Sequence, residues 1–220
     1  MDTMTRLIDI FLHVDRHLLE LVQTHGLWSY AILFTVVFLE TGLVVTPFLP
    51  GDSLLFAAGS LAAAGAFDVV ALLLLLTAAA ILGDTLNYWI GRLVGARVFT
   101  ERSRFFKQEH LLRTQRFYER HGGKTIILAR FLPIVRTFAP FVAGIGHMHY
   151  GRFWAYNAVG AVLWVWGFGL LGYLFGNLPM VKQNFTLVIL GIIAISVVPI
   201  ALELWHARQG KRPAEPGSIP

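Results

Sequence analysis

The sequence predicts an all-α integral membrane protein organised around two charged helical hairpins. Of its 220 residues, 56% are hydrophobic and only 14% are charged, whereas soluble domains carry roughly 25% charged residues. Several apolar stretches approach or exceed the ~20 residues that a membrane-crossing helix needs. Two such stretches contain prolines, glycines and charges that a plain crossing helix tolerates poorly. We therefore expect one polytopic membrane domain over residues 1–205, with two oppositely oriented re-entrant hairpins in an inverted repeat.

The composition also excludes several classes of protein. The chain has no cysteine, which removes disulfides, thiolate nucleophiles and cysteine-based metal sites. Its net charge is +5, but the basic residues cluster between apolar stretches. That distribution indicates membrane topology and a lipid surface rather than nucleic acid. Acidic residues interrupt the first apolar stretch, so we expect no cleaved signal peptide.

The first hairpin covers residues 27–66, and we call it the acidic hairpin. An amphipathic helix over 5–24, lying at the membrane interface or the bundle edge, is expected to precede it. The acidic hairpin carries two carboxylates, Glu40 and Asp52. A carboxylate near the bilayer centre costs on the order of 2.5–3.5 kcal/mol, so both should face protein or trapped water. The helix is expected to break at Pro47, Pro50 and Gly51.

A second hairpin, the basic hairpin, covers residues 125–147. Its apolar run contains Arg130 and Arg136 instead of acids. The expected breaks are at Pro133 and Pro140. Acid on one hairpin and base on the other predict that the two tips meet inside the membrane.

Crossing helices and a basic connection complete the predicted domain. We expect membrane-spanning helices over 69–99, 153–178 and 185–204. The connection over 100–124 and a disordered tail over 206–220 are both basic, which places both on the cytoplasmic side. Two basic segments on one side require an even number of crossings between them. Treating 125–147 as a hairpin gives that even number.

The first spanning helix carries a polar stripe. Gly83, Asn87, Gly91 and Gly95 recur every four residues, a spacing that favours close helix packing. Asp84 lies beside this stripe, and its expected roles are packing, transport, or pairing with the charge of Arg92.

The two halves of the chain resemble each other. Phe48-Leu49-Pro50 recurs as Phe131-Leu132-Pro133, and Ala58-Gly59 recurs as Ala143-Gly144. Gly91-x-Leu93-x-Gly95 recurs as Gly172-x-Leu174-x-Gly176. In transporters, an inverted repeat of this kind places the substrate site where the two broken elements meet.

Each candidate site has a structural alternative. Glu40 and Asp52 would carry protons, or would only cap half-helices and pair with arginine; Asp52 is a candidate N-cap for a half-helix over 53–66. Arg130 and Arg136 would bind a phosphate through their guanidinium forks, or would only form salt bridges. The pair His147 and His149 lacks a third ligand, so a loop position is favoured over a metal site.

Taken together, these motifs resemble the DedA family, whose members contain a VTT domain. The motifs that carry the resemblance are Phe38-Leu39-Glu40, Pro47-x-x-Pro50-Gly51-Asp52, Gly83-Asp84-x-x-x-Tyr88-x-x-Gly91-Arg92 and Arg130-Phe131-x-Pro133-x-x-Arg136. The resemblance implies a bacterial inner-membrane protein that supports envelope integrity. It further implies that Glu40, Asp52, Arg130 and Arg136 are the functional positions.

The predicted function is movement of an anionic lipid across the membrane. The resemblance suggests undecaprenyl phosphate as that lipid and the proton motive force as the energy source. We expect no catalytic residue, cofactor or metal. The sequence is compatible with a homo-oligomer. A proton-coupled cation or drug antiporter and a non-transporting scaffold for envelope assembly are the alternatives. A lipid phosphatase is disfavoured because no nucleophile with an evident base accompanies Arg130.

Overall fold

The computed structural model describes residues 26–43, 51–94, 118, 122–131, 133–184, 187–188 and 190–192. Within these residues every regular element is helical, so the predicted all-α class is confirmed. The expected helix over 5–24, the basic tail, Pro47 and Pro50 lie outside the described residues. So do most of the 100–124 connection and most of the expected last span.

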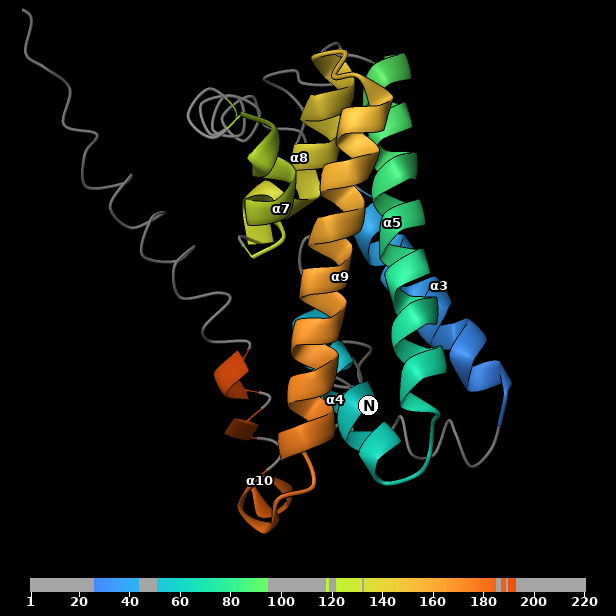
Figure 1. Cartoon of the computed structure of the whole chain (residues 1–220), viewed down its shortest axis with the longest axis vertical. Coiled ribbons are helices and arrows are strands. Elements are labelled where there is room, and N and C mark those ends of the chain that lie inside the picture. The colour runs from blue at the N-terminus through green and yellow to red at the C-terminus, as the bar shows by residue number, and fades with distance from the viewer. Residues whose placement is uncertain are drawn as a thin grey trace, which may run out of the picture.

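Two long helices, α5 (Val69–Val94) and α9 (Tyr150–Phe175), run side by side through the molecule (Figure 1). Each has 26 residues, or roughly 39 Å at 1.5 Å per residue, which is enough to cross a ~30 Å hydrocarbon core. Both are also apolar enough to cross a membrane. The second begins and ends three residues earlier than predicted, because His149 is extended and the short helix α10 (Pro179–Gln183) follows a turn at Leu178.

The acidic hairpin contains two helices, α3 (Trp28–Gly42) and α4 (Gly51–Ala63). Their near ends meet where Glu40 of α3 accepts a hydrogen bond from the Gly51 N–H. Near the start of α3, the Tyr30 hydroxyl accepts a hydrogen bond from the N–H of Asp68, the residue before α5, at 2.9 Å. Neither helix is long enough to cross a bilayer alone, because 15 and 13 residues span only about 22 and 20 Å.

The basic hairpin contains α7 (Thr125–Ala129) and α8 (Pro133–Ile145), preceded by the 3-10 helix η2 (Gly122–Lys124). Pro133 begins α8, at the first helical position where a missing N–H costs nothing. Pro140 lies inside α8, so the prediction that it breaks the chain was wrong. One absent hydrogen bond is tolerated where packing against other helices holds the segment in place, and α8 packs along α5.

The two hairpins approach the long helices from opposite ends (Figure 1). α3 and α4 lie beside the end of α5 that contains Val69, and α7 and α8 lie beside the end of α9 that contains Tyr150. In each hairpin one helix packs on the long helix of the other half: α4 on α9, and α8 on α5. The other helix packs on the long helix of its own half: α3 on α5, and α7 on α9.

Equivalent glycines make these two contacts. A Cβ on Gly59 would overlap the carbonyl oxygen of Gly169 and meet the Tyr173 nitrogen, and a Cβ on Gly144 would meet the corresponding atoms of Tyr88 and Arg92. The reciprocal pair behaves in the same way. A Cβ on Gly172 would overlap the Phe56 carbonyl, and one on Gly91 would overlap the Phe141 carbonyl. The glycines that match between the two halves of the sequence therefore make matching contacts.

We expect Gly172→Ala to destabilise the protein by roughly 1–3 kcal/mol, because the added methyl group would push α9 away from the α4 backbone. Gly167→Ala, in the same helix, is the matched control. Nothing lies within 4 Å of a Cβ at Gly167, so helix propensity should make that change neutral or stabilising by up to ~1 kcal/mol. Unfolding of the purified protein in detergent micelles measures both variants, and equal effects would contradict the close contact.

Candidate functional site

One group of charged residues surrounds Arg136 where the two hairpins meet. The Arg136 guanidinium on α8 donates to Glu40 of α3 at 2.8 Å and reaches Asp52 of α4 at 3.5 Å. The Glu40 side chain is 5% exposed and the Arg136 side chain 13%. The predicted meeting of acid and base is confirmed for Arg136.

Glu40 also closes the acidic hairpin. Its Oε1 accepts a hydrogen bond from the Gly51 N–H at 3.2 Å, at the first residue of α4. The N-terminus of a helix favours a negative charge. Glu40 therefore stabilises the start of α4 in addition to its ion pair with Arg136. Asp52 is not the N-cap that the sequence suggested, because α4 begins at Gly51, two residues before the predicted start at 53, and Asp52 lies in its first turn. A Cβ at Gly51 would overlap the Glu40 carboxylate, which explains why glycine stands there.

A second group surrounds Arg130. Its Nη2 atom lies 2.5 Å from Asp84 Oδ2 on α5 and donates to Asn157 Oδ1 on α9. Asn157 is held in turn by donating to the Ile81 carbonyl at 3.1 Å. Both charged side chains are almost fully buried, at 2% and 5% exposed. Arg130 therefore fastens the basic hairpin to both long helices.

This second group corrects two sequence expectations. Arg130 contacts neither Glu40 nor Asp52, although it was expected to join them. Asp84 pairs with Arg130 rather than with Arg92, whose guanidinium donates to the Tyr88 hydroxyl at 2.8 Å instead. Arg92 is exposed and lies in the last turn of α5, two turns beyond Asp84.

Trp164 joins the two groups from the middle of α9. Its indole Nε1–H donates to Asp52 Oδ1 at 2.6 Å, and the centroid of its ring lies 4.1 Å from the Arg136 guanidinium carbon. The Arg130 guanidinium carbon lies 5.9 Å from the same ring. A cation over the face of a buried tryptophan gains about 2 kcal/mol or more when it is desolvated. Trp164 thus contacts both arginines and one acid.

Asn87 joins the hairpins on the other side. Its amide donates to the Thr137 carbonyl on α8 at 2.9 Å and to the Thr41 carbonyl on α3 at 3.4 Å. Asn87 follows Gly83, where a Cβ would overlap Thr41. The polar stripe predicted on the first spanning helix therefore contacts both hairpins: Gly83 meets α3, Gly91 meets α8, and Asn87 bonds to both.

Sequence reasoning missed Trp164 and Asn157. The second long helix contains several aromatic residues, and its sequence does not show that Trp164 is buried whereas Trp154 is half exposed. A usable signal was present, because Asn157, Gly160 and Trp164 follow each other at spacings of three and four and so share one helical face. Gly160 leaves room on that face for the Arg130 side chain.

The histidines expected in a loop are in one. His147 and His149 lie in the turn between α8 and α9, and His147 has a positive φ of 50°. Within the described residues, no group of three or more side chains has the composition of a metal site.

We expect Trp164→Leu to lower the free energy of unfolding by roughly 1–2 kcal/mol more than Trp164→Phe. Phenylalanine keeps a ring for the two guanidinium groups, whereas leucine keeps neither the ring nor the N–H donor. The same pair of changes at Trp154, which is half exposed on the same helix, is the matched control and should differ little. Unfolding in detergent measures all four variants, and equal losses at both positions would contradict a bridging role.

The fold and the site define a helical membrane protein with buried ion pairs at the junction of two hairpins. The chain belongs to the DedA family: residues 49–174 match the VTT domain. It is 56% identical to Protein DedA of Escherichia coli K12 over 98% of this chain and 100% of that protein. It is 34% identical to the inner membrane protein YqjA of the same organism, over 83% of this chain and 87% of that one. An uncharacterized membrane protein of Mycobacterium tuberculosis is 42% identical over 89% of each chain. No solved structure matches this chain.

Proposed function

We propose that the protein moves an anionic lipid across the bacterial inner membrane. Arg136 and Arg130 would receive the phosphate head group while the hydrocarbon chain stays in the bilayer. Undecaprenyl phosphate is the proposed lipid, because the family resemblance suggests it. No step of this proposal makes or breaks a covalent bond in the lipid, so the protein would not act as an enzyme.

The observation that carries the proposal is the state of the two arginines. Arg136 is held by two carboxylates and an indole, so losing one carboxylate charge would weaken only part of its contacts. Arg130 Nε and Nη1 are buried without a hydrogen-bond partner among the described residues. Buried donors of this kind normally have a partner, and a phosphate oxygen would supply one.

Proton coupling would act through the same contacts. Protonation of Glu40 or Asp52 would remove one of the charges that hold Arg136 and leave its guanidinium available for a phosphate. Glu40 Oε2 has no hydrogen-bond partner among the described residues, so a proton added there would displace no existing bond. Deprotonation would restore the ion pair and expel the lipid.

The proposed architecture is an inverted repeat of two re-entrant hairpins. The short lengths of α3, α4, α7 and α8, their entry from opposite ends and the matching glycine contacts all support it. Trp164 is 14 residues into α9, roughly 21 Å along a helix about 39 Å long. The site would therefore lie near the bilayer midplane, where transporters built from inverted repeats bind their substrates. The C-terminus would lie on the cytoplasmic side.

A flipping assay in proteoliposomes tests the function. Labelled undecaprenyl phosphate and a labelled zwitterionic phospholipid are compared with and without an imposed proton gradient. We expect faster movement of the phosphate lipid, further accelerated by the gradient. Proton-coupled cation flux without lipid movement would favour the antiporter, and the absence of both fluxes would favour the scaffold.

A further inference from the structure

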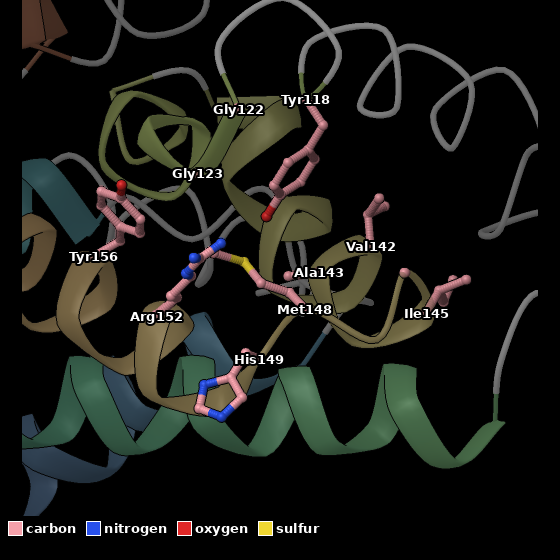
Figure 2. A pocket seen from close by; sticks show the side chains of 11 residues that line it. Tyr118, Gly122, Gly123, Val142, Ala143, Ile145, Met148, His149, Arg152 and Tyr156 are labelled. Atoms are coloured by element: carbon pink, nitrogen blue, oxygen red, sulfur yellow. The ribbon is translucent and has the colours of Figure 1, made fainter.

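A pocket at the open end of the basic hairpin is separate from the charged site. It has a volume of about 780 Å³ and lies between Tyr118, the Gly122-Gly123 turn, the end of α8 and the first two turns of α9 (Figure 2). None of Glu40, Asp52, Asp84, Arg130, Arg136 or Trp164 lines it. Arg152, which does, precedes Trp164 by 12 residues on α9, or roughly 18 Å along the helix.

The permanent charge among the residues that line this pocket is positive. Arg152 is the one lining residue with a permanent charge, and none of the lining residues is acidic. Its guanidinium has no ion-pair partner among the described residues. Figure 2 shows Arg152 extending into the space between Tyr118 and Tyr156, with His149 at the rim. A guanidinium fork without an ion-pair partner among the described residues is suited to a phosphate, which accepts parallel hydrogen bonds.

The walls of the pocket are held in place by the helices around it. The Tyr118 hydroxyl donates to the Ala139 carbonyl of α8 at 2.9 Å. Burial raises the pKa of the Tyr118 phenol, and the Asp84 carboxylate raises it further, so this hydroxyl stays neutral and keeps donating. On the opposite wall, the Met148 carbonyl accepts a hydrogen bond from Tyr88 of α5. A Cβ at Gly123 would overlap the Tyr156 ring, so glycine is needed for that wall to close.

The pocket also has an apolar side. Met148 lies beside Arg152, and Val142 lines the far side of the pocket (Figure 2). The pocket lies where α9 begins, at one end of the long helices. A basic group beside apolar side chains, at the end of two membrane-length helices, suits a ligand in which a phosphate is joined to a hydrocarbon chain. We propose that this pocket binds a phosphate group, carried by an anionic lipid or free in solution, through Arg152. This binding does not depend on transport through the charged site.

Equilibrium binding to the purified full-length protein in an uncharged detergent tests the site. The probes are dihexanoyl phosphatidate, inorganic phosphate and the zwitterionic dihexanoyl phosphatidylcholine. We expect Arg152→Gln to weaken phosphatidate binding roughly ten-fold or more, because a hydrogen bond to a charged group contributes ~1.5–3 kcal/mol. Lys124→Gln is the matched control. Lys124 is exposed, as Arg152 is, but its side chain does not line the pocket. Its loss should change affinity less than about three-fold.

The two phosphate probes identify the source of the ligand. Tighter binding of phosphatidate than of inorganic phosphate, with both dependent on Arg152, assigns the pocket to a lipid head group; equal binding assigns it to free phosphate. Wild-type protein that binds neither probe would overturn the site, as would an Arg152→Gln variant that binds both normally. Phosphatidate binding lost in Arg136→Gln but kept in Arg152→Gln would also overturn it, while leaving the transport proposal intact.

Discussion

Arg136→Ala is expected to reduce lipid movement roughly 100-fold, because two charged hydrogen bonds to a phosphate are lost together. The same change should destabilise the protein by about 3–5 kcal/mol, since it leaves Glu40 buried without its cationic partner. Arg136→Lys should give a lipid flux and a stability between those of the wild type and of Arg136→Ala, because lysine keeps the charge but not the planar fork. Labelled-lipid flux in proteoliposomes and unfolding in detergent are the two measurements.

A double variant separates the structural role of Arg136 from its role with lipid. Glu40→Gln in the Arg136→Ala background removes the unpaired charge, so much of the lost stability should return. Flux should not return, because no guanidinium is left at that position. Recovery of flux together with stability would mean that Arg136 is a structural partner of Glu40 and does not contact the transported lipid.

Asp84→Ala is expected to cost about 3–5 kcal/mol of stability, because it leaves the Arg130 guanidinium buried without its counter-charge. Arg92→Ala provides the comparison, since Arg92 was the partner that the sequence suggested for Asp84. Arg92 is exposed, so its loss should cost no more than about 1 kcal/mol. Asp84→Asn should be intermediate. Thermal unfolding in detergent ranks the three variants, and a larger loss for Arg92→Ala would contradict the pairing seen in the structure.

Local patterns in the sequence predicted the helices better than the contacts between them. Apolar length and proline positions indicated the long helices and the hairpins, because these features act within one segment. Pro133 was read correctly for the same reason. Pro140 was not, because whether a helix continues through a proline depends on what packs around it. Here α8 lies along α5, and the sequence of α8 alone does not reveal that support.

The pairing of charges could not be deduced from their signs alone. Two arginines and three acids can form several different ion pairs. Which pairs form depends on which helix each side chain faces, and the charges do not specify that. Arg130 lies against α9, next to Gly160, which directs it to Asp84 and Asn157. Arg130 caps the end of α7, whereas Arg136 lies in the first turn of α8 and meets the acidic hairpin. The bridging role of Trp164 was not predicted, because an aromatic residue in an apolar helix does not indicate which side chains it contacts.

The packing of α4 on α9 and of α8 on α5 has a consequence for synthesis in the cell. Glu40 leaves the ribosome 96 residues before Arg136, its partner in the finished protein. At roughly 5–20 residues per second, that carboxylate waits about 5–20 seconds without a counter-charge. The nascent acidic hairpin also lacks the helix that will cover it. Until translation is nearly complete, this half needs water, lipid head groups or an insertion factor as a temporary partner.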